Sequence, residues 1–321
     1  MKINNVLVLL PLDGIQKELI EREFEGVNFI YKNSNDVDLD LIKDIEAIIG
    51  NPKADILKDA DSLKWLQLNS AGADKYIKDG VLNKNVMLTN ATGAYGLSIS
   101  EHMIGLLLNI FKNLNIYMNN QRNHIWHDEG SVKSIYGSKI LIIGLGNIGE
   151  EFAKRVKAFG AYTIGVRRSN LNKPEFIDEI YLMEDIDNLL PEADVVALSL
   201  PNTKETFKMF SKERFKLMKK DSVLLNVGRG NVLDTDALCD AVESGHLLGA
   251  GIDVTDPEPL PEDHKIWDIE NIIITPHVSG GYHMKETLES ILNISIDNLR
   301  NLINDKPLKN VVDFSTGYAK K

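Results

Sequence analysis

Three side chains in the second half of the sequence could act together on a carbonyl group. Arg229 stands between two glycines, Glu258 between two prolines, and His277 directly after Thr275-Pro276. Each follows an apolar run that predicts a strand, and open α/β sheets bind ligands beyond the carboxyl ends of their strands. A histidine there can protonate a carbonyl oxygen while a carboxylate holds the imidazole and favours its protonated form. An arginine can polarise the carbonyl and bind a neighbouring carboxylate.

Taken singly, each of these residues is more typical of a solvated or structural loop position. Together, and beside a cofactor motif, they suit hydride transfer to a carbonyl. That motif is G-x-G-x-x-G after the apolar run 140–143 and before a helix-like stretch, which is the context that indicates dinucleotide binding. The glycines permit a tight turn, close approach of a pyrophosphate and close helix–strand packing, and the helix N-terminus offers free N–H groups. The cofactor-binding residues predicted in this motif are Gly144, Gly146, Asn147, Ile148 and Gly149.

The residues after the second strand of this unit predict which dinucleotide binds. An acidic residue at the end of the strand 161–166 would bind the ribose hydroxyls and favour NAD. The chain has Arg167, Arg168 and Ser169 instead, and two guanidinium groups with a hydroxyl suit a 2′-phosphate. We therefore predict that NADP(H) is preferred and NAD(H) possible. The alternative is that both arginines are solvated surface charges.

Four motifs occur in one order along the chain: the glycine motif, Asn226–Gly230, Asp253–Pro261 and Thr275–Gly280. With these motifs the chain resembles the D-isomer-specific 2-hydroxyacid dehydrogenases over nearly its whole length. The resemblance implies an α/β fold of two Rossmann-like doubly wound parallel-sheet domains separated by a cleft, and catalysis by the arginine, glutamate and histidine above. The two adjacent arginines are similar to those of the NADPH-using glyoxylate and hydroxypyruvate reductases of the family.

The resemblance also implies further binding residues. Residues 69–74 match the family's substrate loop, in which backbone N–H groups would hold the substrate carboxylate; the alternative is an ordinary strand-to-helix turn. The residues implied for substrate binding are Ser70, Ala71, Gly72, Arg229 and His277. Those implied for the cofactor are Pro201, Thr206, Val227, Gly228, Asp253, Ser279 and Gly280, with Asp253 at the nicotinamide end.

Two α/β units must position these residues. Apolar runs predict strands at 6–10, 47–49, 65–68 and 86–88, and then at 139–143, 161–166, 194–200, 222–226, 249–253 and 271–275. Helices are predicted at 147–159, 184–190, 211–218, 234–244 and 286–302. A capping-box pattern at Ser98 and Glu101 predicts one long helix from Ser98 to about Asn119. The tail from Lys306 is polar and is expected to run over the surface.

Because about 140 residues precede the glycine motif, we expect the first domain to take back the C-terminal helix. Residues 1–97 with 286–321 are then a discontinuous, flavodoxin-like substrate-binding domain. Residues 98–285 are the dinucleotide-binding domain, with a dimerisation helix and arm at 98–137. The apolar helix and the family resemblance predict a homodimer, in which Trp126 reaches the partner's pocket.

Composition excludes several other roles. A net charge of −11 over 321 residues argues against nucleic-acid binding, and no apolar run is long enough to span a bilayer. The single cysteine, Cys239, forms no internal disulfide and fits a reducing compartment; with no targeting segment evident, a cytoplasmic protein is expected. His124 and His127 lack a third ligand, so no metal is expected.

A small 2-oxoacid or 2-hydroxyacid is the expected substrate. Two alternatives stay open: an activity like that of D-3-phosphoglycerate dehydrogenase, and a non-catalytic dinucleotide sensor or corepressor. Such sensors can keep the catalytic residues, so the three side chains alone do not exclude that role. We find no appended charged or disordered extension, which favours the enzyme.

Overall fold

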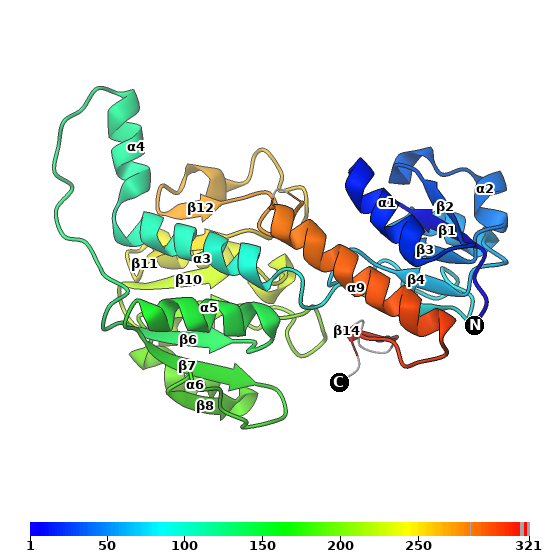
Figure 1. Ribbon diagram of the computed structural model, residues 1–321. Helices are drawn as coiled ribbons and strands as arrows, with labels where there is room; N and C mark the ends of the chain where they lie inside the picture. Colours follow the sequence, from blue (N-terminus) through cyan, green and yellow to red (C-terminus); the bar gives the residue numbers. More distant parts are fainter. Residues whose placement is uncertain (283, 315–317, 320–321) are drawn as a thin grey trace. The chain divides into compact units, whose positions relative to one another are not determined.

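The structure is a computed structural model that describes residues 1–282, 284–314 and 318–319. The chain forms two compact units, each built on a parallel sheet (Figure 1). One unit is Met1–Tyr95 with Tyr282–Lys321, and the other is Gly96–Gly281. The fold class is therefore two parallel-sheet α/β domains, as the sequence predicted.

The first unit contains a five-stranded parallel sheet with strand order β2-β1-β3-β4-β5. Its strands are β1 (Asn5–Val8), β2 (Asn28–Tyr31), β3 (Ala47–Ile49), β4 (Trp65–Gln67) and β5 (Met87–Thr89). Its helices are α1 (Gly14–Glu23), α2 (Leu39–Lys43) and α9 (Lys285–Ile303), with 3-10 helices at Ser34–Asp36 and Ala54–Asp59. One apolar cluster joins the central strands to α2 and to the second 3-10 helix.

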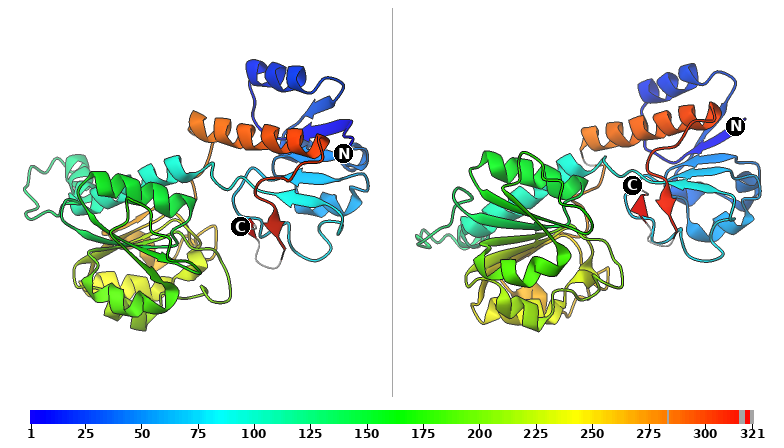
Figure 2. Two further views of the ribbon diagram at one scale, coloured as in Figure 1. Left: turned by 60° about the horizontal axis from the view of Figure 1, so that its bottom comes forward. Right: turned by 90° about the horizontal axis from the view of Figure 1, so that it is seen from below.

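Helix α9 returns from the far end of the chain to cover this sheet (Figure 2). Buried Asn298 fixes it there, because its Nδ2 donates to Gln67 Oε1 at 2.8 Å and to Lys309 O at 3.0 Å. Its Oδ1 accepts from the Lys309 N–H at 2.7 Å. A buried amide with all of these partners satisfied ties the helix, the sheet and the following segment together.

The second unit contains a seven-stranded parallel sheet with strand order β12-β11-β10-β9-β6-β7-β8. Its strands are β6 (Lys139–Ile143), β7 (Tyr162–Arg167), β8 (Glu179–Leu182), β9 (Val195–Leu198), β10 (Ser222–Asn226), β11 (Leu247–Ile252) and β12 (Ile272–Ile274). Its helices are α3 (Gly96–Phe111), α4 (Leu114–Arg122), α5 (Asn147–Ala158), α6 (Ile186–Leu189), α7 (Lys212–Leu217) and α8 (Thr235–Glu243). Its 3-10 helices are Met183–Asp185, Leu190–Glu192, Gly230–Val232 and Lys265–Asp268.

Helices cover both faces of this sheet, α3 and α5 on one side and α7 and α8 on the other (Figure 2). The chain runs from β6 outward to β7 and β8, then crosses back to β9 on the opposite side of β6. The carboxyl ends of β6 and β9 therefore form a topological switch point, where open α/β sheets bind their ligands.

Two edge strands and a helix break were missed from the sequence. β2 and β8 are half-exposed edge strands with runs of three apolar residues, 29–31 and 180–182, and the second sheet has seven strands rather than about six. The predicted helix 98–119 is two helices, because Asn113 adopts a left-handed backbone (φ 54°) between α3 and α4. Asparagine is one of the few residues that tolerate this conformation.

One local prediction is also wrong. α3 begins at Gly96, so Ser98 is not its cap; its hydroxyl donates to Ser279 O at 2.7 Å instead. The tail from Lys306 to Phe314 runs over the surface as expected, except that Val312 is buried; Val311 bridges Thr89 at the sheet edge. In this tail, β13 (Val312–Asp313) pairs with β14 (Tyr318–Ala319), whereas residues 315–317 and 320–321 lie outside the described part.

Candidate active site

The glycine motif lies at the switch point, directly after β6. Gly144 has a φ of +98°, and a Cβ there would lie 2.7 Å from Ser199 O, so only glycine fits this turn. A Cβ on Gly149 would lie 2.4 Å from Gly144 O, which is how the helix packs against the turn. A Cβ on Gly146, by contrast, would meet no other atom within 4 Å. The backbone there faces open space, as a pyrophosphate requires.

The first turn of α5 fits a phosphate group. Gly146 precedes the helix and has no side chain to cap it, while exposed Asn147 and half-buried Ile148 are its first residues. The first N–H groups of a helix have no intrahelical acceptor, and their dipoles favour an anion. The residues present therefore fit a dinucleotide.

Two neighbouring loops border the same edge of the sheet. After β9, the Thr206 hydroxyl donates to Pro201 O at 2.6 Å and accepts from the Thr203 N–H at 2.9 Å. These two hydrogen bonds fix the conformation of the loop. After β10 come buried Val227 and then Gly228, where a Cβ would lie 2.4 Å from Leu200 O. The β9 and β10 loops are therefore in direct backbone contact.

The predicted phosphate-binding arginine has a partner that the sequence did not reveal. Arg167 ends β7, and its Nη2 lies 2.5 Å from Glu150 Oε1 in the first turn of α5. Its Nη1 donates to Asn170 Oδ1 at 3.1 Å. The Arg167 side chain is 15% exposed, whereas Arg168 and Ser169 are exposed. A carboxylate therefore stands beside the predicted 2′-phosphate site, supplied by α5 rather than by the end of β7.

His277 and Glu258 form a hydrogen-bonded pair. His277 Nδ1 lies 3.0 Å from Glu258 Oε2, and the Thr255 N–H donates to Glu258 Oε1 at 3.1 Å. The His277 backbone is left-handed (φ 53°), and its N–H donates to Asp253 O at 2.8 Å. With Nδ1 facing the carboxylate, Nε2 is the nitrogen that can deliver a proton.

Asp253 holds the loop that carries His277. Its side chain is 1% exposed, and its carboxylate accepts four hydrogen bonds. Oδ1 accepts from Thr275 Oγ1 at 2.5 Å and from the Val278 N–H at 3.0 Å. Oδ2 accepts from the N–H and the hydroxyl of buried Ser279, which is followed by half-buried Gly280. His102 of α3 joins the network, with its Nε2 2.9 Å from Thr275 Oγ1.

Arg229 lies on the adjoining loop after β10. Its backbone is extended, Nη1 donates to Gly228 O at 2.8 Å, and its carbonyl accepts from Asn226 Nδ2 at 3.0 Å. A Cβ on Gly230 would lie 2.0 Å from the Thr255 carbonyl. The loop of Arg229 therefore packs against the loop that carries Glu258.

The predicted substrate loop belongs to the other unit. The Ser70 hydroxyl donates to Gly72 O at 2.7 Å and accepts from Asn51 Nδ2 at 3.1 Å, so it is already engaged. Asn90 Nδ2 donates to Ala71 O at 2.7 Å. Within the described part of the chain, no hydrogen bond uses the N–H groups of Ala71 and Gly72. The loop is thus pinned through its oxygens, while two amide donors stay free.

The family follows from comparison with known proteins. A family model described as the D-isomer specific 2-hydroxyacid dehydrogenase, NAD binding domain, matches residues 104–279. The chain belongs to this family. This dehydrogenase is 31% identical to a probable 2-ketogluconate reductase of Dictyostelium discoideum over 94% of this chain and 93% of that one. It is 30% identical to a glyoxylate reductase of Thermococcus onnurineus, over 88% of each chain.

A solved structure gives the same result. A D-isomer specific 2-hydroxyacid dehydrogenase family protein from Aeromonas salmonicida matches with a TM-score of 0.88 and 29% identity, over 98% of this chain and 100% of that one. The dehydrogenase is therefore an NAD(P)-dependent oxidoreductase that uses a nicotinamide dinucleotide.

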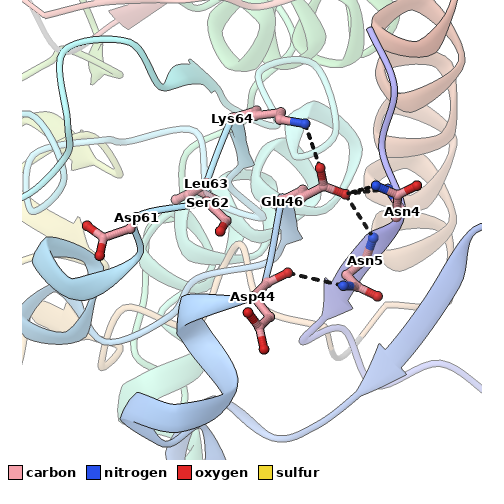
Figure 3. Close-up of a pocket in the computed structure, with 8 residues that line it drawn as sticks. All are labelled: Asn4, Asn5, Asp44, Glu46, Asp61, Ser62, Leu63 and Lys64. Atoms are coloured by element: carbon pink, nitrogen blue, oxygen red, sulfur yellow. Dashed lines mark hydrogen bonds and ion pairs between the residues drawn. The ribbon is translucent and has the colours of Figure 1, made fainter.

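The first unit of the dehydrogenase contains a hollow. It is polar and lies beside the amino ends of β1, β3 and β4, opposite to the ligand-binding edge of an α/β sheet (Figure 3). Its lining residues are Asn4, Asn5, Asp44, Glu46, Asp61, Ser62, Leu63 and Lys64. Glu46 accepts from Lys64 Nζ at 2.5 Å and from the N–H groups of Asn4 and Asn5, so its charge is already satisfied within the fold.

Other sequence features have structural explanations. Cys239 is buried in α8, and burial raises the pKa of its thiol to about 11. Among the described residues, no three His, Cys, Asp or Glu side chains are grouped to hold a metal ion. No helix in that part of the chain has the length and apolar character to cross a membrane.

Proposed function

We propose that the protein reduces a small 2-oxoacid, such as glyoxylate or hydroxypyruvate, to the D-2-hydroxyacid with NADPH. The observation that carries this proposal is the 3.0 Å contact between His277 Nδ1 and Glu258 Oε2, on a loop fixed by Asp253. This contact orients His277 as a general acid in the unit that also carries the glycine motif, and reduction of a carbonyl needs both an acid and a bound dinucleotide.

Each side chain of the site has its own part in this reaction. NADPH, when bound, supplies a hydride to the carbonyl carbon. His277 gives the Nε2 proton of its imidazolium to the carbonyl oxygen, so the C=O becomes a CH–OH group and the imidazole is left neutral. Glu258 stabilises the imidazolium before transfer and keeps the ring oriented. Arg229 polarises the carbonyl and binds the adjacent carboxylate.

We assign NADP(H) as the preferred cofactor, with NAD(H) also accepted. Arg168 and Ser169 are exposed beyond β7, and Arg167 precedes them in the chain with its guanidinium paired to Glu150. These donors suit the 2′-phosphate of the adenosine ribose. The rest of the cofactor would be lined by the glycine motif and by seven further residues: Pro201, Thr206, Val227, Gly228, Asp253, Ser279 and Gly280.

The unit that contains residues 69–72 is assigned to the substrate, and Gly96–Gly281 to the dinucleotide. The free N–H groups of Ala71 and Gly72 would bind the substrate carboxylate, with the engaged Ser70 hydroxyl shaping the loop. We further propose that the protein is a homodimer joined through residues 98–137.

The decisive experiment is NADPH and NADH oxidation with a panel of 2-oxoacids. We expect turnover of glyoxylate or hydroxypyruvate, faster with NADPH, and a loss of about a hundredfold or more in kcat for His277→Ala. A parallel assay follows the reduction of NAD⁺ with 3-phosphoglycerate. Activity there, without turnover of glyoxylate or hydroxypyruvate, would favour a phosphoglycerate dehydrogenase instead. Tight dinucleotide binding without turnover of any 2-oxoacid would favour a non-catalytic sensor.

A further inference from the structure

The contact between Glu150 and Arg167 bears on which cofactor the site prefers. At the end of this strand, dinucleotide folds either bind the free ribose hydroxyls with an acid or bind a 2′-phosphate with a base. This chain places both kinds of group there, since Glu150 Oε1 lies 2.5 Å from Arg167 Nη2. The acid comes from the first turn of α5 and the base from the last residue of β7.

Arg167 depends on that contact. Its side chain is 15% exposed, and its Nε is buried with no hydrogen-bond acceptor in the described part of the structure. Glu150 and Asn170 take its Nη2 and Nη1. A charged group with so little exposure needs a counter-charge, because desolvation disfavours an unpaired ion.

A 2′-phosphate would have to share Arg167 with Glu150. The phosphate carries close to two negative charges at neutral pH. An oxygen bound to the Arg167 guanidinium lies within a few ångströms of the Glu150 carboxylate, where like charges repel even though Glu150 is 35% exposed. A ribose 2′-hydroxyl carries no charge and meets no such repulsion.

We propose that Glu150 is a cofactor-selectivity residue: its carboxylate holds Arg167 and weakens binding of the 2′-phosphate, so that NADH remains usable beside NADPH. This inference rests on the proposed dinucleotide site. If Glu150 has this role, exposed Arg168 and Ser169 provide most of the preference for NADPH, and the preference over NADH is moderate.

The test compares two fragments that differ in the phosphate of interest. The affinities of the full-length protein for 2′,5′-ADP and for 5′-AMP are measured by calorimetry in the wild type, Glu150→Gln and Glu150→Ala. We expect both variants to bind 2′,5′-ADP about tenfold more tightly and 5′-AMP within about twofold of wild type. The alanine variant excludes a new hydrogen bond from the glutamine amide as the cause.

Glu151→Gln is the matched control. It removes the same charge one residue further along α5, where Glu151 pairs with Lys154 and Arg155. It should leave both affinities within about twofold. An equal gain in Glu151→Gln, or an equal gain for both fragments in the Glu150 variants, would reduce the effect to net charge and overturn the proposal.

Unchanged or weaker 2′,5′-ADP binding in the Glu150 variants would also overturn it. Loss of 5′-AMP binding in both Glu150 variants would overturn it too, because the contact between Glu150 and Arg167 would then be needed for the structure of the site. Fragment binding needs no turnover, so it separates this proposal from the assigned reaction. Failure of the wild type to reduce any 2-oxoacid contradicts the reaction alone, and failure of the wild type to bind either fragment contradicts both.

Discussion

His277 is constrained through both its side chain and its backbone. Glu258 fixes the imidazole at 3.0 Å, and the His277 N–H is bonded to Asp253 O while the backbone holds a left-handed conformation. Left-handed backbone is uncommon outside glycine, although histidine tolerates it better than most residues. The surrounding loop therefore has to maintain it, and strained residues of this kind cluster at functional sites.

Replacing Glu258 by Gln should slow the reduction. The carboxylate orients the imidazole through Nδ1 and stabilises the positive charge that the ring carries before it gives up its proton, and a glutamine amide supplies no such charge. We expect kcat at neutral pH to fall by about tenfold or more, with a smaller change in substrate KM. The measurement is kcat and KM for a 2-oxoacid at saturating NADPH. Glu262→Gln removes an exposed carboxylate of the same segment and should keep the wild-type kcat; an unchanged kcat in Glu258→Gln would refute the pairing.

Replacing Asp253 by Asn should loosen the loop that carries His277. Each oxygen of the Asp253 carboxylate accepts two hydrogen bonds. In the asparagine variant an NH2 group replaces one oxygen, so it cannot accept those two bonds and its hydrogens face the donors. Loss of bonds to a buried charge costs on the order of 1.5–3 kcal/mol, so we expect a lower Tm as well as a lower kcat. Asp256→Asn, at an exposed position nearby, is the control. Weaker NADPH binding with an unchanged Tm would instead indicate that Asp253 contacts the nicotinamide and does not hold the loop.

The amino ends of three strands are joined by one carboxylate. Glu46 precedes β3, accepts from Asn4 and Asn5 at the start of β1, and pairs with Lys64 before β4 (Figure 3). Burial alone would raise the pKa of Glu46, but the Lys64 ion pair and the two N–H donors outweigh it and lower the pKa to about 2. The side chain is only 12% exposed, so solvent screens this interaction little.

This pair predicts how stability depends on pH. The folded pKa lies below the ordinary 4.5, so the stabilisation is complete above about pH 5 and is lost as pH falls towards 2. At neutral pH, Glu46→Gln should be less stable by on the order of 2–3 kcal/mol. Urea unfolding at several pH values measures both effects. The difference between the two proteins should shrink as the pH falls, and a difference that does not change with pH would contradict this assignment.

How far the elements could be predicted depended on their burial. Central strands such as β6 are buried at every position after the first and appear as apolar runs, whereas the edge strands β2 and β8 are half-exposed and carry runs of only three apolar residues. Glu258 and His277 could be anticipated from their positions after strands only together with the glycine motif, because each alone is typical of a solvated loop. The contact of Glu150 with Arg167 could not, because it depends on which turn of α5 faces the end of β7.

At the scale of the whole molecule, the segment 114–136 exposes an unusual amount of apolar surface. The large apolar side chains exposed there are Leu114 (45%), Met118 (49%), Ile125 (52%), Trp126 (104%), Val132 (51%) and Tyr136 (79%). Isolated exposed apolar residues are ordinary, but a run of them in one segment is typical of an interface. A twofold dimer would bury the same segment from both copies.

Light scattering at micromolar concentration tests this assembly. We expect about twice the chain mass of 35.9 kDa, and a mass near that of one chain would refute the dimer. Trp126→Ala should weaken dimerisation by about tenfold or more, since buried tryptophans carry a large share of interface energy. Trp267→Ala is the matched control, because Trp267 is also exposed, at 51%, but lies outside residues 98–137. Equal dissociation in both variants would show that loss of a tryptophan, rather than this segment, controls assembly.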